Sequence, residues 1–235
     1  MRAEFPAAVL FDLFGTLVPL PDAQVRLRRR RELAHRLGCD ADAFIDAYTR
    51  TKATRLAGGF GSVRGALDAV AHLAGGRPAD SAVIEAEREL LSWTRSDLSL
   101  APERGRFLAG LRSSGMRLGL VSDCEVEVAE VLFDMPLAQY FDAVTLSCAT
   151  GVRKPEAAQY EHCAGQLGVE VARCLFVGDG GSRELWGAER AGAKPIHFCD
   201  DGLNPSMRRG QWPGHRADSL AALSMTINVC AMGAP

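Results

Sequence analysis

Acidic side chains stand directly after short apolar runs in this chain, in positions where they could do chemistry. Asp12 follows the run Ala8-Val9-Leu10-Phe11 and precedes a glycine-containing turn, and Asp179 closes a similar stretch that begins at residue 174. A carboxylate at the end of a buried parallel strand can act as a nucleophile or hold a metal ion, because open α/β sheets bind their ligands at that edge. The alternative is a carboxylate that only caps a turn.

Two further polar side chains occupy comparable positions. Ser122 ends the apolar run 118–121, and Lys154 stands at the start of a helical pattern. Taken alone, Ser122 is typical of a helix cap and Lys154 of a surface side chain. Together with Asp12 and Asp179 they predict one crevice, because the carboxyl ends of parallel strands meet at the same edge of a sheet.

The elements that must position these residues alternate between strand and helix. From Pro102 onward, short apolar runs alternate with segments of helical periodicity, which predicts a doubly wound parallel sheet with helices on both faces. We therefore expect a Rossmann-like α/β core of five strands or more. The predicted strands are 8–11, 118–121, 143–146, 174–177 and 195–198, and the segment 200–216 is predicted to be a loop before a terminal helix at 217–223.

The segment after the first strand contains only helical patterns. It predicts a bundle of four helices, at 22–37, 42–56, 63–74 and 81–95. We expect residues 19–100 to form an inserted helical cap over the carboxyl ends of the strands, with residues 1–18 and 101–235 forming the core. Within this cap, Tyr48 and Trp93 stand at helical spacing among apolar neighbours, which predicts core packing.

Composition and charge exclude several classes of function. The 235 residues are 47% apolar and 24% charged with a formal net charge of −2, which gives no electrostatic footprint for nucleic acid or an anionic membrane. Asp12 interrupts the apolar N-terminal stretch before a signal peptide or membrane span could form. The seven cysteines are scattered without a Cys-x-x-Cys pair, which favours free thiols in a reducing compartment. We expect a cytoplasmic monomer or homodimer whose partner is a small, anionic molecule.

The joined motifs resemble the haloacid dehalogenase superfamily of hydrolases. The resemblance covers the whole chain, in the order of the family's motifs, with a helical cap at the family's insertion point. The residues that carry it are Phe11-Asp12-Leu13-Phe14-Gly15-Thr16, Val121-Ser122, Arg153-Lys154-Pro155, Val177-Gly178-Asp179, and the downstream pairs Gly187-Ala188 and Ala191-Gly192. It implies hydrolysis through an aspartyl-enzyme intermediate, most simply of a small phosphate ester.

The resemblance also implies roles for the residues that would touch the substrate. Asp12 would be the nucleophile that carries the covalent intermediate. Ser122 would donate its hydroxyl to an oxygen of the transferring group. Lys154 would place an ammonium between the nucleophile and that group, and so reduce the repulsion between two anions.

A magnesium site is implied as well. Mg²⁺ would be held by Asp12, Asp179 and the main-chain carbonyl of Phe14. Glu184 matches a position where the family often carries a second acid, which acts on the metal through water. Backbone N–H groups from Leu13 to Gly15 would cradle the substrate anion.

Phe14 departs from the family pattern. Phosphatases of this superfamily read Asp-x-Asp in the first motif, and the second Asp moves the proton of the leaving oxygen. A phenyl ring cannot transfer a proton, so a contribution of about 10²–10⁴-fold to the rate has no evident source. Phe14 is compatible with a Mg²⁺-dependent phosphatase that uses a good leaving group or a substitute acid. Asp123 is the candidate substitute, and a turn-stabilising carboxylate is the alternative interpretation of it.

Phe14 is also compatible with different chemistry. Family members that displace halide from 2-haloacids carry an aromatic Tyr at this position, need no metal, and replace the metal-binding Asp of the fourth motif by Ser, whereas this chain keeps Asp179. A carbon–phosphorus hydrolase of the family needs a cap lysine, and Lys52 is the only lysine between residues 19 and 100. A sensor or regulatory protein that keeps the fold and does little chemistry is the remaining hypothesis.

Two features of the cap could contact a substrate. The run from Arg26 to Arg31 contains five arginines, which predicts either a solvated helix face or the capture of a substrate carboxylate or distal phosphate. The glycine-rich segment 58–62 joins two predicted cap helices. Its Phe60 could cover a ligand, and an ordinary interhelical turn is the alternative.

Overall fold

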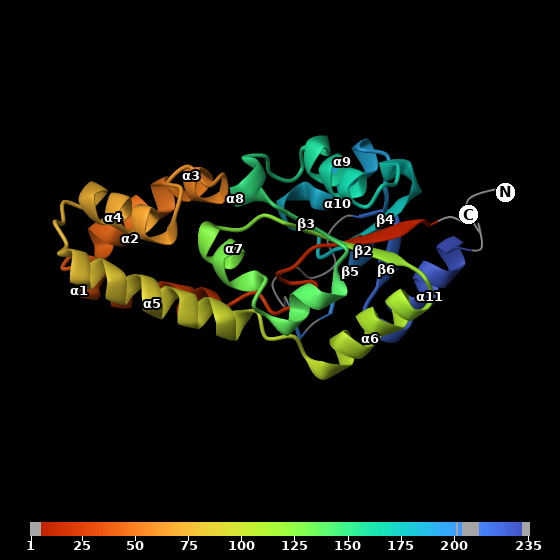
Figure 1. Ribbon diagram of the computed structural model, residues 1–235, viewed down its shortest axis with the longest axis horizontal. Coiled ribbons are helices and arrows are strands. Elements are labelled where there is room, and N and C mark those ends of the chain that lie inside the picture. The colour runs from red at the N-terminus through yellow and green to blue at the C-terminus, as the bar shows by residue number, and fades with distance from the viewer. Residues whose placement is uncertain (1–5, 201, 204–211, 232–235) are drawn as a thin grey trace.

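The computed structural model describes residues 6–200, 202–203 and 212–231, and within these ranges it contains one parallel sheet of six strands (Figure 1). The spatial order is β3-β2-β1-β4-β5-β6, with β1 near the middle. This confirms the predicted Rossmann-like α/β fold. The strands are β1 (Ala8–Phe11), β2 (Arg117–Ser122), β3 (Ala143–Leu146), β4 (Cys174–Gly178), β5 (Lys194–Phe198) and β6 (His215–Ala217).

Strand β6 lies in a segment that was expected to be a loop. It pairs with β5 through Ile196 opposite His215 and Phe198 opposite Ala217. The prediction was therefore wrong at the end of that segment, of which residues 201 and 204–211 lie outside the described residues. The physical reason is that β6 is a three-residue edge strand whose sequence has no apolar run.

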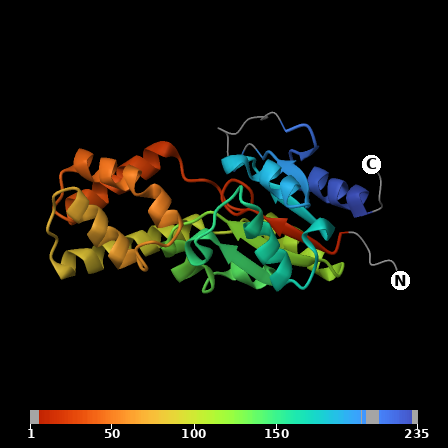
Figure 2. The same ribbon diagram turned by 90° about the horizontal axis from the view of Figure 1, so that it is seen from above.

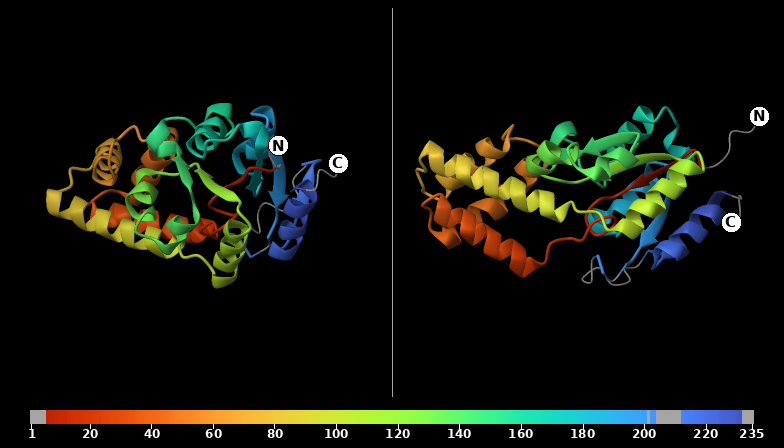
Figure 3. Two further views of the ribbon diagram at one scale, coloured as in Figure 1. Left: turned by 45° about the vertical axis from the view of Figure 1, so that its right-hand side comes forward. Right: turned by 60° about the horizontal axis from the view of Figure 1, so that its bottom comes forward.

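Helices cover both faces of the sheet because successive side chains of β1 point to opposite sides. Val9 and Phe11 pack on the face covered by α6 (Pro102–Ser113), α7 (Val126–Leu132) and α11 (Leu220–Ala231). Figure 3 shows α6 and α11 together on that face. Ala8 and Leu10 pack on the other face, against α9 (Ala157–Gln166) and α10 (Glu184–Arg190). Short helical turns complete the core: η1 (Pro136–Tyr140), α8 (Ser147–Thr150), η2 (Val171–Arg173) and η3 (Gly181–Arg183).

The cap consists of helices only. It contains α1 (Ala23–Arg36), α2 (Ala41–Arg50), α3 (Lys52–Leu56), α4 (Val63–Leu73) and α5 (Asp80–Asp97). Side chains of Asp22, Asp40 and Ser62 accept hydrogen bonds from the first free N–H groups of α1, α2 and α4, which fixes where those helices begin. The inward faces share one hydrophobic cluster, in which Leu33, Phe44 and Leu67 are almost fully buried. The cap therefore has a core of its own.

One predicted cap helix is divided in two. The segment expected to be a single helix from 42 to 56 breaks at Thr51, between α2 and α3, so the expected four helices are five. The Thr51 hydroxyl donates to the backbone oxygen of Ala47 at 2.7 Å. A side chain that bonds its own helix in this way bends it.

The cap lies beyond the carboxyl ends of the strands. In Figure 1 β1 runs from the N-terminal side of the core toward the cap, and Figure 2 shows the cap helices beside the core in the perpendicular view. Helix α7, which follows β2, packs against α5 and so joins the two parts. Among the described helices, none is both long and apolar enough to cross a membrane.

Candidate active site

Asp12 stands where β1 ends, at the centre of the sheet. Its backbone N–H donates to the oxygen of Val177 on the neighbouring strand at 2.9 Å, which continues the sheet pairing up to this residue. Its carboxylate is 5% exposed and accepts hydrogen bonds from Thr16 Oγ1, at 3.1 Å, and from Lys154 Nζ. The sharp turn after it depends on Gly15, whose φ of 84° strains any other residue.

Lys154 is a buried ammonium held between two carboxylates. Its Nζ donates to Asp12 Oδ1 and to Glu184 Oε2, the second at 2.5 Å. Burial alone would lower the pKa of this ammonium, but the carboxylates of Asp12 and Glu184 raise it well above its ordinary value. Lys154 is therefore a permanent positive charge beside Asp12.

Three carboxylates form a cluster here, and two of them, Asp12 and Glu184, bind this ammonium. Ligand atoms of Asp12, Asp179 and Glu184 lie within 4.8 Å of one another, although the residues come from β1, the end of β4 and the start of α10. Burial, and then the Asp12 carboxylate, raise the pKa of Glu184 well above its ordinary value, against the opposing effect of Lys154. Carboxylate oxygens at this spacing fit a Mg²⁺ ion, which prefers such ligands and would offset the negative charge that Lys154 leaves.

Glu184 has both of its oxygens engaged within the protein. Oε2 binds Lys154, and Oε1 accepts the backbone N–H of Gly180 at 3.0 Å. A carboxylate held in this way fits the predicted position outside the inner ligands of a metal.

Ser122 and Asp123 place unused polar atoms at the end of β2. The Ser122 hydroxyl is buried and, within the described residues, has no hydrogen-bond partner. An oxygen of a bound anion would supply that partner, which is the role predicted for it. Asp123 accepts the backbone N–H of Lys154 through Oδ1 at 2.9 Å, and its buried Oδ2 has no partner in the described part of the chain. Asp123 thus positions the backbone of Lys154 and still has one oxygen unpaired.

The loop after Asp12 differs in detail from a simple anion cradle. The N–H of Gly15 donates to the oxygen of Val18 at 2.7 Å, so it is already used inside the loop. Burial raises the pKa of the Asp12 carboxyl. The N–H of Leu13 donates a hydrogen bond to this carboxylate, which opposes part of that rise. The cradle predicted for Leu13 to Gly15 stays a prediction.

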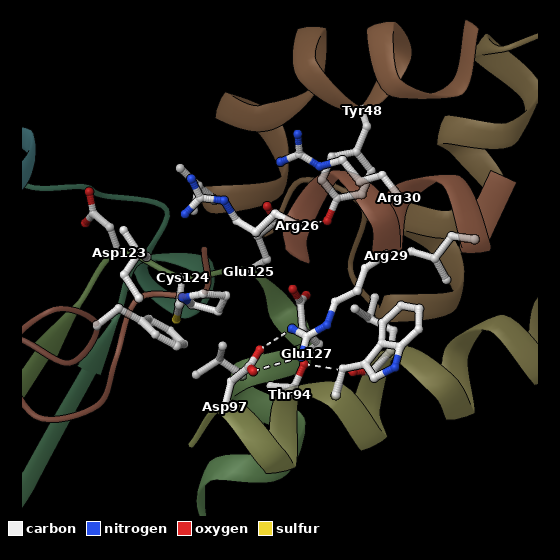
Figure 4. A pocket seen from close by; sticks show the side chains of 18 residues that line it. Arg26, Arg29, Arg30, Tyr48, Thr94, Asp97, Asp123, Cys124, Glu125 and Glu127 are labelled. Atoms are coloured by element: carbon white, nitrogen blue, oxygen red, sulfur yellow. Dashed lines mark hydrogen bonds and ion pairs between the residues drawn. The ribbon is translucent and has the colours of Figure 1, made fainter. Parts of the chain in front are cut away.

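A cavity of about 210 Å³ lies between the cap and the core (Figure 4). Phe14 and Asp123 line it from the core, and they follow Asp12 and Ser122 in the chain. The side chains of Asp12, Lys154, Asp179 and Glu184 are not part of its lining. The cap lines it with basic and aromatic side chains, among them Arg26, Arg29, Arg30, Tyr48 and Trp93. If the reacting group of a substrate meets Asp12, the rest of the molecule would lie past Phe14 and Asp123, in this cavity.

Phe60 does not belong to this cavity. It is half-buried in the loop between α3 and α4. Neighbouring Gly58 packs so closely on the core that a Cβ there would lie 2.0 Å from the backbone oxygen of Cys148. The predicted contact of Phe60 with a ligand stays a prediction.

A polar group that sequence reasoning missed joins the cap to the core. Arg55 binds Glu125 through two hydrogen bonds, at 2.7 and 3.1 Å, and its guanidinium lies 3.4 Å from the ring centroid of Tyr48. The Tyr48 hydroxyl donates to the same Glu125 at 2.9 Å. Burial, and then the charge of Glu125, raise the pKa of Tyr48 well above its ordinary value, so the phenol keeps its proton. We call these three residues the cap–core bridge.

A model of haloacid dehalogenase-like hydrolases matches residues 6–192, which is most of the chain. The chain belongs to this family. The resemblance stated from the motifs is therefore confirmed at the level of the family and the fold.

Several curated relatives of this haloacid dehalogenase-like hydrolase are phosphatases. A ribulose-1,5-bisphosphate 5-phosphatase of Halopiger xanaduensis is 26% identical, over 81% of this chain and 84% of that protein. A phosphoglycolate phosphatase of Yersinia pseudotuberculosis is 28% identical, over 80% of this chain and 78% of that protein. A phosphoserine phosphatase of Thermus thermophilus is 31% identical over 107 residues, which are 45% of this chain and only 43% of that protein.

Solved structures show the same fold. A phosphatase from Thermococcus onnurineus matches with a TM-score of 0.65 and 23% identity, over 94% of this chain and 97% of that one. A 2-haloacid dehalogenase from Pseudomonas syringae matches with a TM-score of 0.69 and 20% identity, over the same shares of the two chains. Because phosphatase and dehalogenase chemistry both occur on this fold, the site itself must decide between them.

Proposed function

We propose that this hydrolase is a Mg²⁺-dependent phosphatase that acts on small phosphate esters through an intermediate on Asp12. The observation that carries the proposal is the buried cluster of three carboxylates, Asp12, Asp179 and Glu184. Two of them, Asp12 and Glu184, bind the ammonium of Lys154. The single ammonium of Lys154 leaves two of the three carboxylate charges unbalanced, and one divalent cation would balance them. The curated relatives, which are phosphatases of small molecules, support the same interpretation.

Asp12 is the proposed nucleophile. A carboxylate oxygen of Asp12 attacks phosphorus, the bond from phosphorus to the ester oxygen breaks, and the leaving oxygen takes a proton. Water then hydrolyses the acyl phosphate, which releases phosphate and restores Asp12. Lys154 lowers the repulsion between Asp12 and the incoming dianion, and the Ser122 hydroxyl donates to a phosphoryl oxygen.

The metal ligands follow from the same cluster. Asp12, Asp179 and the main-chain carbonyl of Phe14 would hold Mg²⁺, with Glu184 outside them. When bound, the ion supplies positive charge to the oxygens of the transferring phosphoryl group.

The proton of the leaving group needs a source other than Phe14. Asp123 has the position for it: it lines the cavity beside Phe14, and its Oδ2 is unpaired among the described residues. We therefore propose Asp123 as the acid that replaces the missing carboxyl group.

Release of inorganic phosphate tests the proposal. Native protein and the variant Asp12→Asn are given 4-nitrophenyl phosphate and glycerol 3-phosphate, each with Mg²⁺ or with EDTA. We expect phosphate release by native protein with Mg²⁺ only, and none by the variant. Metal-independent release, or full activity in Asp12→Asn, would contradict the mechanism.

Halide displacement is the second candidate, because aromatic Phe14 lines the cavity and a halide leaving group needs no proton. Chloride release from 2-chloropropionate in the presence of EDTA would establish it in place of the phosphatase. Binding of phosphate or 2-chloropropionate without any turnover would instead favour a regulatory protein.

A further inference from the structure

Three arginines of α1 line the cavity: Arg26, Arg29 and Arg30. Arg26 and Arg30 are four residues apart, so they share one face of the helix, and both contribute to the cavity wall. Figure 4 shows Arg30 over the ring of Tyr48, and Arg26 reaching toward the Asp123 end. The neighbouring Arg28 is exposed on another face and pairs with Glu32 at 3.6 Å. The arginine run therefore has an inner and an outer side.

Of these three arginines, Arg26 and Arg30 are not neutralised by the described part of the protein. Within the described residues, no carboxylate lies within ion-pair distance of Arg26 or Arg30, and Arg30 only stacks at 4.8 Å on the ring of Tyr48. The cavity's own acids are already engaged: Asp97 binds Arg29 through two hydrogen bonds, at 2.5 and 2.9 Å. Two half-buried guanidinium groups without a counter-charge are costly unless a ligand completes them.

The remaining acids of the cavity do not provide this counter-charge. Asp123 lies at the core end, where its Oδ1 accepts the backbone N–H of Lys154, and within the described residues it forms no ion pair with Arg26 or Arg30. Glu125 is taken by Arg55 in the cap–core bridge. Burial, and then the charge of Glu125, raise the pKa of Glu127 to about 8, so this carboxyl is largely uncharged at neutral pH. The cap end of the cavity consequently carries positive charge that only a bound anion can balance.

We propose that Arg26 and Arg30 bind a second anionic group of the substrate, a carboxylate or a second phosphate, at the end of the molecule away from Asp12. This rests on the proposed phosphatase function, which places the reacting phosphate at Asp12, beyond Phe14 and Asp123 at the core end of the cavity. The planar guanidinium matches both anions through paired N–H donors. A cavity of about 210 Å³ limits the substrate to a small molecule.

Matched pairs of substrates test the inference, and they distinguish a carboxylate from a second phosphate as the anion that the two arginines bind. 3-Phosphoglycerate and glycerol 3-phosphate differ by a carboxylate, and the bisphosphate and monophosphate of 1,3-propanediol differ by a phosphate. In native protein we expect kcat/KM to favour the member with the second anion in at least one pair, and that pair identifies the anion. In Arg26→Gln and Arg30→Gln the preference falls by about 10- to 100-fold, mainly through KM, because the contact exists before and during the reaction.

Arg28→Gln and Arg31→Gln are the matched controls, since both side chains lie on exposed positions of the same helix. We expect these controls to keep the native substrate preference. If they lose as much of that preference as Arg26→Gln and Arg30→Gln do, the effect comes from net charge and the inference is overturned. If the protein hydrolyses 4-nitrophenyl phosphate but prefers neither member of either substrate pair, the inference is overturned and the proposed function stands. Absence of turnover of every phosphate ester overturns the proposed function, and this inference with it.

Discussion

Lys154 is the residue on which the electrostatics of the site depend most directly. It is the common partner of Asp12 and Glu184, and its side chain is only 4% exposed. A buried carboxylate that loses its counter-charge is strongly destabilised, and removal of one partner of a buried pair costs about 3–5 kcal/mol. The proposed mechanism places the same ammonium beside the incoming phosphate, so its loss should affect both folding and catalysis.

We predict that Lys154→Ala lowers kcat by about 10²–10³-fold, the size expected for the loss of one preorganised charge at the reacting group. The variant should also unfold at a lower urea concentration. Lys52→Ala, on the exposed surface of α3, is the control and should retain both properties. A loss of rate in Lys154→Ala no larger than that of a cap variant would contradict the role given to Lys154.

Asp123 allows a sharper test through the leaving group. If it protonates the leaving oxygen, Asp123→Asn should slow glycerol 3-phosphate, whose alkoxide is a poor leaving group, by about 10²–10⁴-fold. The nitrophenolate ion leaves without a proton, so 4-nitrophenyl phosphate should lose far less. Equal losses on both substrates would show that Asp123 acts only by holding the backbone N–H of Lys154, the contact seen at 2.9 Å.

The positions of the acidic residues were predictable, but the cavity was not. Asp12 and Asp179 follow apolar strands, and the parallel sheet alone brings them to one edge. Tyr48 and Trp93 pack with the core of the cap as expected, and they also line the cavity. Helical periodicity shows that two residues share a face, and it does not show whether part of that face meets a ligand. Arg55 gave no signal, because its partner Glu125 is distant in sequence.

At the scale of elements, strand and helix positions followed from apolar periodicity wherever the element was long or buried. The strand 143–146 was predicted with its observed bounds. The failures are local: β6 is an edge strand without an apolar run, and the break at Thr51 depends on one hydroxyl bond. Neither feature changes the hydrophobic pattern from which predictions are made.

Helix α7 carries a pH-dependent element of stability in Glu127. Its carboxyl is half-buried, and burial followed by the charge of Glu125 raises its pKa from 4.5 to about 8. Between these values the unfolded chain has released this proton and the folded chain still holds it. The free energy of unfolding therefore falls as pH rises through this window.

Glu127→Gln removes this titration and should raise the Tm at pH 8 by about 2–4 °C, the shift expected for roughly 1 kcal/mol in a chain of this size. The difference from the native protein should shrink toward pH 5. Glu161→Gln, exposed on α9, serves as the control and should leave the pH dependence unchanged. A gain in Tm of the same size at both pH values would refute the assignment.

The whole molecule has two parts: an α/β core that contains the carboxylate cluster, and a helical cap that packs against α7 of that core. The cavity has walls from both, so its shape depends on how the cap is held against α7. The cap–core bridge fixes that relation at one point, since Arg55 and Tyr48 belong to the cap and Glu125 precedes α7. The Arg55 side chain is 3% exposed and that of Glu125 is 18% exposed, so solvent screens this pair little.

A double-mutant cycle measures what the bridge contributes to the whole molecule. We predict a coupling free energy of about 1–3 kcal/mol between Arg55→Met and Glu125→Gln in urea unfolding, because neither group has another charged partner as close. The exposed pair of Arg50 and Asp46, at 2.9 Å within α2, should give less than about 0.5 kcal/mol in the same cycle. If the two couplings are equal, the bridge does not hold the cap. If the bridge is stronger and its single variants also raise KM for phosphate esters, then cap position and substrate binding depend on the same contact.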